Sequence, residues 1–260
     1  MKNNMKKLLP LLLLSAIAFA TTANSKIDDP KKNIKTGSLS VHFVNLINGR
    51  DLKLNDTVSL YKNANGDDFK VTTFKYYISN VSLIEKNGGK VIVPDSYFLI
   101  NAADSSTLIQ KITNIPEGKY VGMTFTIGVD SLRNFAGAQS GALDPAKGMF
   151  WTWNSGYIFV KLEGESTKST AKKNRLTFHI GGAKDPDNTI RTFTQKFPNT
   201  LRISDGKLPE LELVANAGAL FQGKTTVDFA KLNFTMGGPN SVVVADNYAN
   251  GLFKIIKVRN

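Results

Sequence analysis

The sequence predicts an all-β protein, an antiparallel two-sheet β-sandwich built as a single domain. The 260 residues are 42% apolar, 10% aromatic and 21% charged, which is enough apolar material to bury one core. After residue 37, short runs that alternate apolar with polar residues, or that are rich in β-branched and aromatic residues, are separated by Gly, Asn, Asp and Pro. Such runs are typical of strands, and no segment shows a long apolar period of 3.6 residues.

The amino-terminal residues predict a targeting signal. Three lysines precede an apolar run, Leu8–Phe19, and small residues follow it up to Ala23. This order is typical of a cleaved secretory signal peptide over residues 1–23. A membrane helix needs about 20 apolar residues, and this run is shorter. Residues 24–37 are polar and lysine-rich and predict a flexible lead-in to a β domain over residues 38–260. We therefore expect a periplasmic or secreted protein that is not inserted in a membrane.

Within the β domain, eight runs predict strands, and Asn87-Gly88-Gly89 between two of them predicts a tight hairpin, because these residues accept the positive φ of such a turn. Short helices are expected at Ser131–Ala138 or Asp228–Leu232, and nothing longer is indicated. The predicted strands are Ser38–Ile47, Val71–Ile84, Lys90–Asn101, Tyr120–Val129, Phe150–Leu162, Arg175–Ile180, Thr189–Phe197 and Glu210–Ala215.

The charge is basic but dispersed. The formal net charge is +12, and removal of residues 1–23 takes away three lysines and no acid, which leaves +9. The lysines and arginines stand one or two at a time, and the one dense group, Lys168–Arg175, has the composition of a loop. We interpret the charge as a source of solubility and weak electrostatic steering, and we expect no nucleic-acid partner.

Four segments imitate two kinds of ligand-binding motif. Gly218–Thr225 fits the phosphate-binding loop pattern and Val242–Asp246 imitates the strand that accompanies it. Too few residues follow to complete a parallel α/β nucleotide-binding domain, so we interpret the first as a turn between strands. Asn65–Asp68 and Asp185–Asn188 carry oxygen ligands that suit calcium, but neither has EF-hand spacing, and both are interpreted as turns.

The residue inventory limits the chemistry. The absence of cysteine removes disulfides, thiolate metal sites and thiol nucleophiles. Histidine chemistry depends on His42 and His179, each inside a strand-like run and each directed opposite to its apolar neighbours. Trp151 and Trp153 are the two tryptophans of the chain, and in a strand their spacing places both indoles on one face. No nucleophile, base and orienting group can be assembled, so an exported hydrolase is the weakest alternative.

The tryptophan segment and its surroundings resemble the MbnP family, exported proteins associated with methanobactin genes. The resemblance runs over roughly residues 38 to 260. The segments that carry it are Phe74–Asn80, Ile127–Ser131, Gly137–Pro145, Gly148–Tyr157, Lys161–Gly164 and Phe178–Gly182.

This resemblance implies a copper-binding periplasmic β-protein that is not an enzyme. In some members the metal is held by histidines and by a tryptophan oxidised to kynurenine, and the oxidation is attributed to a MauG-type dihaem cytochrome c peroxidase-like partner. It implies His179 as the first ligand, with His42 and one tryptophan of the Trp151–Trp153 pair. Imidazole nitrogen suits copper, and a kynurenine offers an amine and carbonyl oxygens that an indole lacks.

The chain departs from the family's pattern at two places. Copper-handling relatives tend to carry a histidine where this chain has Asn45, and some carry one near Met236-Gly237-Gly238. These departures bear on the metal and not on the fold. The alternative from another class is a metal-free binding module in which Trp151, Trp153 and Tyr157 form an aromatic platform for a small ligand or glycan.

Overall fold

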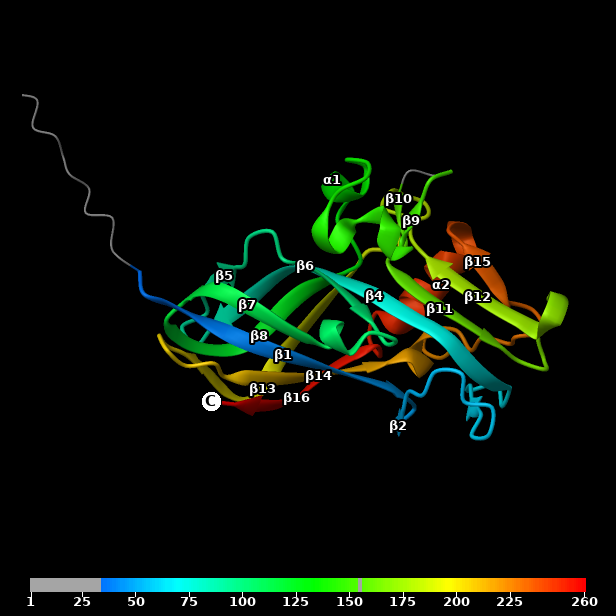
Figure 1. Ribbon diagram of the computed structural model, residues 1–260, viewed down its shortest axis with the longest axis horizontal. Coiled ribbons are helices and arrows are strands. Elements are labelled where there is room, and N and C mark those ends of the chain that lie inside the picture. Colours follow the sequence, from blue (N-terminus) through cyan, green and yellow to red (C-terminus); the bar gives the residue numbers. More distant parts are fainter. Residues whose placement is uncertain (1–33, 154–155) are drawn as a thin grey trace, which may run out of the picture. The chain divides into compact units, whose positions relative to one another are not determined.

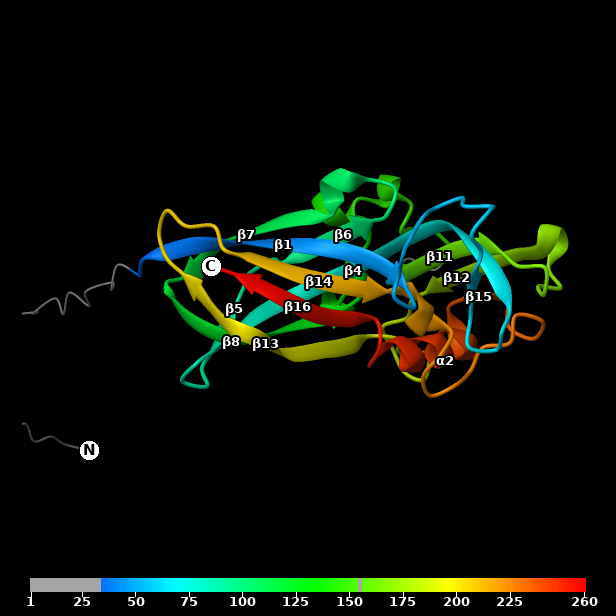
Figure 2. The same cartoon turned by 90° about the horizontal axis from the view of Figure 1, so that it is seen from below.

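Two β-sheets face each other around a shared apolar core in the computed structural model (Figures 1 and 2). The structure describes residues 34–153 and 156–260, so the predicted signal peptide and most of the predicted lead-in lie outside the described residues. Residues 34–260 form one compact unit. The all-β, sandwich-like architecture is confirmed.

The first sheet is built on strand β1. It has the order β16-β14-β1-β2, and β7 also pairs with β1. Figure 2 shows β1, β14 and β16 side by side in one layer. The strands of this sheet are β1 (Thr36–Ile47), β2 (Arg50–Asp51), β7 (Ile109–Pro116), β14 (Glu210–Asn216) and β16 (Phe253–Arg259).

The second sheet is built on the long strand β4. Its order is β13-β8-β4-β11-β12-β15, with three short strands, β3, β5 and β6, paired to β4. Its strands are β3 (Tyr61–Lys62), β4 (Asp68–Glu85), β5 (Lys90–Ile92), β6 (Tyr97–Asn101), β8 (Gly118–Ile127), β11 (Val160–Glu165), β12 (Arg175–Ile180), β13 (Arg191–Ile203) and β15 (Phe234–Met236). A separate two-stranded ribbon joins β9 (Phe150–Trp151) to β10 (Gly156–Tyr157).

Alternation along the strands puts one face of each sheet into the core. In β1, Leu39, Val41 and Phe43 are buried with the apolar side chains of the second sheet. Aromatic rings cross between the sheets: Tyr76 on β4 lies 6.3 Å from Phe43 and 5.3 Å from Phe253 on β16, centroid to centroid. The residues that alternate with these core residues along each strand therefore point away from the core, toward the outer face of each sheet.

The prediction of purely antiparallel sheets is wrong at two places. Strand β1 pairs with β14 in parallel, and β12 pairs with β15 in parallel. Parallel neighbours need a long crossover between them, and each pair joins segments far apart in the chain. Periodicity along a single strand carries no information about such pairing.

The predicted elements are found with changed bounds. Strand β1 begins at Thr36, inside the predicted flexible lead-in. The predicted run Lys90–Asn101 is broken into β5 and β6, and Phe150–Leu162 is divided among β9, β10 and β11. The hairpin at Asn87–Gly89 is confirmed between β4 and β5, with Gly88 at φ +91°.

The helices differ from the prediction more than the strands do. The first predicted helix is a single turn, α1 (Ser131–Asn134), and Asp228–Leu232 forms turns. The segment that imitates a strand belongs to an eleven-residue helix, α2 (Gly238–Tyr248). None of the helices in the described part of the chain is long and apolar enough to cross a membrane.

The two imitated ligand motifs are structural. In Gly218–Thr225, a short 3₁₀ turn ends at Leu220, and Lys224 forms an ion pair with Asp246 of α2 at 3.0 Å. In the Asn65–Asp68 turn, Asp67 is buried and accepts a hydrogen bond from the Phe229 N–H at 3.0 Å. Its carboxylate therefore faces N–H donors, as a turn predicts.

Candidate functional site

His179 lies on the outer face of the second sheet. Its neighbours in β12, Phe178 and Ile180, enter the shared core, so the pleat directs His179 away from it. The side chain is nevertheless only 9% exposed.

A carboxylate holds one nitrogen of this imidazole. Glu163 on the adjacent strand β11 lies on the same outer face, and its Oε1 is 2.8 Å from His179 Nε2. Thr73 of β4 donates to the other carboxylate oxygen at 3.0 Å, and the Lys161 ammonium lies 3.4 Å from Oε1. The His179 hydrogen bond, followed by the charge of Lys161, lowers the pKa of Glu163 to about 2 although burial opposes it.

This contact determines which histidine nitrogen is available. An ionised carboxylate only accepts hydrogen bonds, so Nε2 of His179 carries the hydrogen and donates it. In a neutral imidazole the lone pair then lies on Nδ1. Nδ1 makes no hydrogen bond within the described residues, and this nitrogen is the one that can bind a metal ion.

The two tryptophans are in contact, but not as neighbours on one strand face. Strand β9 ends at Trp151 and the chain turns, so Trp153 lies in the turn. The two ring centroids are 5.5 Å apart, with the planes tilted by 43°. Trp151 is 5% exposed and Trp153 is 65% exposed. The Nε1–H of Trp151 is buried and has no hydrogen-bond partner.

Glycines bring Trp151 close to the histidine strand. A Cβ on Gly181, two residues after His179, would lie 2.8 Å from Trp151 Cζ3, closer than real side-chain contacts allow. A Cβ on Gly237 would lie 3.8 Å from Trp151 Cη2, and the Gly237 N–H donates to the His179 carbonyl at 3.3 Å. The indole of Trp151 thus packs on backbone next to the end of β12.

Two lysines of the same outer face donate hydrogen bonds to the segment that leads to Trp151. Lys75 donates to the Lys147 carbonyl at 3.0 Å, and Lys161 donates to the Gly148 carbonyl at 3.4 Å. Burial, followed by the nearby Lys161 charge, lowers the pKa of Lys75. The outer face therefore joins the tryptophan segment to β4, β11 and β12 beside His179.

His42 is not part of this arrangement. It lies on β1 in the first sheet, directed away from the shared core, with Nε2 3.0 Å from Ser40 Oγ and 3.8 Å from Glu210. The core separates it from the outer face of the second sheet, so the structure does not bring His42 and His179 together. Asn45, on the same strand, faces the core and accepts a hydrogen bond from the buried Tyr76 hydroxyl at 3.0 Å.

The proposed aromatic platform is not formed. Tyr157 is fully buried, with its hydroxyl bonded to the Leu143 carbonyl at 2.8 Å, and Trp151 is also buried. Trp153 alone of the three rings is exposed. The prediction of a three-ring platform is wrong because β10 turns Tyr157 into a second small core, shared with Tyr77 and Phe150.

Two residues beside His179 were not predicted as site residues. Glu163 follows Leu162 in a run that alternates apolar with polar residues. This alternation predicts that Glu163 lies on the outer face, but it does not predict which residue Glu163 contacts. Met236 is the register partner of His179 across the parallel β12–β15 pair. No sequence signal joins Met236 to His179, because a long stretch of chain separates the two paired strands.

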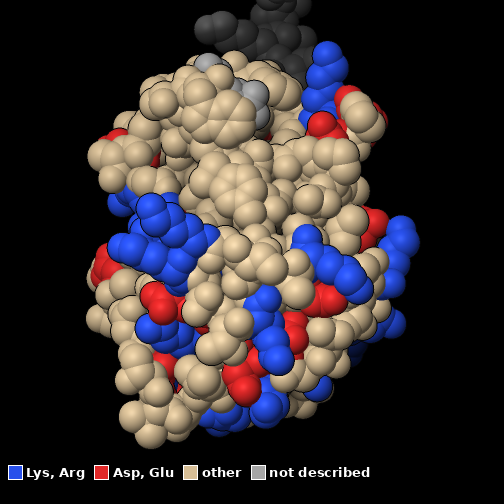
Figure 3. Space-filling view, turned by 90° about the vertical axis from the view of Figure 1, so that its right-hand side faces the viewer, with Lys and Arg blue, Asp and Glu red and all other residues tan. Residues whose placement is uncertain are grey.

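The charged residues beside His179 lie on β4 and β11, whereas the region of α1, β9 and β10 carries few. Figure 3 shows that the region at the top of the molecule, where Figure 1 places α1, β9 and β10, is mostly free of charged residues, whereas lysines and acids intermingle below it. A cavity of about 240 Å³ lies beside Trp151, lined by α1 and β10 residues and by Lys184 and Asp187. Within residues 34–153 and 156–260, no group of three or more His, Asp or Glu side chains is arranged to hold a metal ion.

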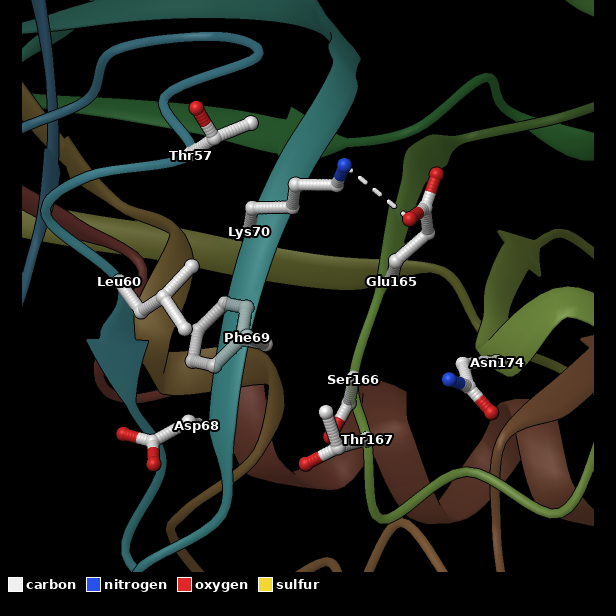
Figure 4. A pocket seen from close by; sticks show the side chains of 9 residues that line it. All are labelled: Thr57, Leu60, Asp68, Phe69, Lys70, Glu165, Ser166, Thr167 and Asn174. Carbon is white, nitrogen blue, oxygen red and sulfur yellow. Dashed lines mark ion pairs between the residues drawn. The ribbon is translucent and has the colours of Figure 1, made fainter.

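A second hollow lies elsewhere on the second sheet. It has a volume of about 190 Å³ between the start of β4 and the end of β11 (Figure 4). Its charged side chains are engaged: Lys70 pairs with Glu165 at 3.1 Å, and Asp68 pairs with Lys62 at 2.9 Å. It contains no histidine, and we do not assign it to the site.

The comparison with protein-family models supports the resemblance seen in the sequence. The family model MbnP matches residues 36–242. Among solved structures, MbnP from Methylosinus trichosporium is similar, with a TM-score of 0.49 and 15% identity over 72% of this chain and 78% of that one. The comparison with curated proteins found no match.

Proposed function

This chain belongs to the MbnP family, and from that premise we propose that it is an exported copper-binding protein whose metal ligand is His179. It binds the metal and catalyses no reaction of its own. The export is supported by the signal-peptide pattern of residues 1–23, which directs the protein to the periplasm or the medium.

The observation that carries this proposal is the Glu163–His179 pair. A metal-binding histidine usually donates its second ring N–H to a carboxylate, which orients the ring and raises the basicity of the ligating nitrogen. His179 makes this contact through Nε2 at 2.8 Å, and Nδ1 remains for the metal. Thr73 and Lys161 hold the carboxylate in turn. An imidazole so held suits copper.

Trp151 lies next to His179 and becomes a metal donor only after oxidation. The indole of Trp151 packs at the end of the histidine strand, and its Nε1–H is a buried donor without a partner, which is an unfavourable arrangement for an unmodified side chain. Oxidation by peroxide, delivered through a peroxidase, adds two oxygen atoms across the indole C2–C3 bond and cleaves it. Hydrolysis then releases C2 as formate and leaves an aniline amine, a net loss of one carbon and gain of one oxygen. We propose that one tryptophan of the pair is modified in this way by a MauG-type dihaem peroxidase-like partner.

The proposed function is tested on the protein purified from the periplasm of its native host. Metal analysis of the wild type is expected to give one copper per chain, and His179→Ala is expected to abolish this binding. His42→Ala is the matched control, because this histidine lies on the other sheet and should leave the stoichiometry unchanged. Wild-type protein that takes up no copper, or equal binding by both variants, would contradict the proposal.

The modification is tested by intact-protein and peptide mass spectrometry of the same sample. We expect one tryptophan of the peptide that spans Trp151 and Trp153 to show the loss of one carbon and the gain of one oxygen. Protein produced without the peroxidase partner should retain both tryptophans unmodified. An unmodified pair in the native sample would contradict the kynurenine proposal while leaving copper binding by His179 open to the first test.

A further inference from the structure

Met236 lies beside His179 on the outer face. Strands β12 and β15 pair in parallel, and His179 is the register partner of Met236. Thr235 points to the opposite face, where it is buried and bonded to Ser241 of α2 at 2.9 Å. The pleat therefore places the Met236 side chain on the same face as His179, on a neighbouring strand about 4.8 Å away.

The carboxylate and the thioether belong to the two strands that flank the strand of the imidazole. Strand β12 lies between β11, which carries Glu163, and β15, which carries Met236. Glu163 engages Nε2 from the β11 side at 2.8 Å. On the β15 side, the cross-strand neighbour of His179 is the sulfur-bearing side chain, and the second ring nitrogen has no hydrogen-bond partner among the described residues.

The local environment favours a soft ion of low charge. Met236 is partly buried and packs against the apolar cluster that contains Trp151. On the β11 side, Lys161 is the register partner of His179, and Lys75 of β4 is the partner of Lys161, so two ammonium groups share this row of the sheet. The Glu163 carboxylate offsets one of these charges. The remaining positive charge disfavours a divalent ion more than a monovalent one, since Coulomb repulsion scales with charge.

We propose that the thioether of Met236 is a second copper ligand beside His179. This inference rests on the proposed copper binding and names a further ligand of the same site. Thioether sulfur is a soft ligand that selects Cu(I), whereas imidazole alone accepts several metal ions.

The experiment compares the exported wild-type protein with Met236→Leu and Met236→His. Cu(I) affinity is measured anaerobically by competition with a chromogenic Cu(I) chelator, Cu(II) affinity is measured by isothermal titration, and the ligand atoms are identified by X-ray absorption at the copper edge. Met123→Leu, a buried methionine of the shared core, is the matched control for replacing a thioether.

In the wild type we expect a copper–sulfur scattering path and tighter binding of Cu(I) than of Cu(II). Met236→Leu, which retains the packing volume, should lose the sulfur path and weaken Cu(I) binding at least tenfold, with little effect on Cu(II). Met236→His should raise Cu(II) affinity relative to Cu(I), and Met123→Leu should behave as the wild type.

Two results would overturn the inference, and they are distinguishable. Copper bound by the wild type through nitrogen and oxygen only, with affinity unaffected by Met236→Leu, removes Met236 from the site but retains His179 and the proposed function. A wild type that binds copper in neither oxidation state overturns the proposed function and this inference together. Circular dichroism of each variant excludes misfolding as the cause of a loss.

Discussion

Glu163 orients the imidazole of His179 without contacting the metal in the proposed site. We expect Glu163→Gln to weaken copper binding about 10- to 100-fold, the usual effect of removing a carboxylate behind a metal-binding histidine. The amide can still accept the Nε2 hydrogen bond, but it lacks the charge that raises the basicity of Nδ1. The measurement is a competitive copper titration of the exported protein.

The matched control for this change lies two residues further along the same strand. Glu165 is on the same outer face but pairs with Lys70 at 3.1 Å, away from His179. Glu165→Gln should leave copper affinity within about twofold, because an exposed ion pair contributes little. Equal weakening by both variants would show that Glu163 acts through the general charge of the face and not through His179.

At single positions, the sequence predicted which way a side chain points better than which residues the side chain contacts. Alternation in Phe178-His179-Ile180 was sufficient to direct His179 out of the core, because the flanking side chains must be buried. It also directed His42 outward, but it could not say that the two histidines lie on different sheets. Neither Glu163 nor Met236 was predicted as a neighbour of His179, since their approach depends on strand order and register.

Among the elements, the turn before β4 depends on one buried carboxylate. Asp67 accepts hydrogen bonds from the Phe229 N–H at 3.0 Å and from the Asn63 amide at 3.1 Å, and it thereby ties this turn to the segment before β15. Burial raises the pKa of Asp67, but these donors and the Asn65 amide outweigh it, so the pKa lies below its ordinary value of 3.8.

This shift predicts an acid-dependent loss of stability. A carboxyl group whose pKa is depressed on folding stabilises the protein above its unfolded pKa, and the stabilisation is lost as the pH falls through the folded value. Asp67→Asn should therefore destabilise the protein at pH 7 by about 1 to 3 kcal/mol. The difference from the wild type should shrink as the pH is lowered below 3.8.

Urea unfolding of both proteins at several pH values measures this difference. Asp68→Asn is the control, since Asp68 forms a largely exposed pair with Lys62, and its effect should be below about 1 kcal/mol. A difference for Asp67→Asn that is constant over the whole pH range would contradict the assignment of the stabilisation to the ionised carboxylate.

The missed helix α2 shows where local pattern and propensity disagree. Val242-Val243-Val244 are β-branched and favour a strand, but Pro239 stands in the first turn, and Gly237 before it has φ +79°. Pro fits the start of a helix. The buried positions Ser241, Val244, Ala245 and Tyr248 follow the spacing i, i+3, i+4, i+7 of a helix face. That spacing was available in the sequence and was outweighed by β-branching.

The molecule as a whole depends on contacts that no local pattern contains. The parallel pair of β1 with β14 matches Ser40 to Glu210 and Leu46 to Asn216. The aromatic rings that join the two sheets likewise come from β1, β4, β8, β13 and β16. Composition and alternation therefore predicted two packed sheets, whereas strand order and the parallel pairs required the full set of tertiary contacts.

Phe253 is the ring through which this shared core can be tested. It lies on β16 in the first sheet, is 6% exposed, and its centroid is 5.1 Å from Phe125 and 5.9 Å from Phe193 of the second sheet. Phe253→Ala should destabilise the protein by about 3 to 5 kcal/mol, the usual cost of deleting a buried aromatic ring. Ile256→Ala, on the exposed side of the same strand, should cost much less.

If the two sheets unfold as one cooperative unit, two optical probes must report the same transition. Tryptophan fluorescence reports the outer face near Trp151 and Trp153, and far-ultraviolet circular dichroism reports both sheets. In Phe253→Ala the midpoints of both probes should move together to lower denaturant concentration, because the deleted ring joins the sheet that lacks the tryptophans to the sheet beside them. A fluorescence midpoint that remained at the wild-type value while the dichroism midpoint fell would show that the candidate site unfolds independently of the first sheet.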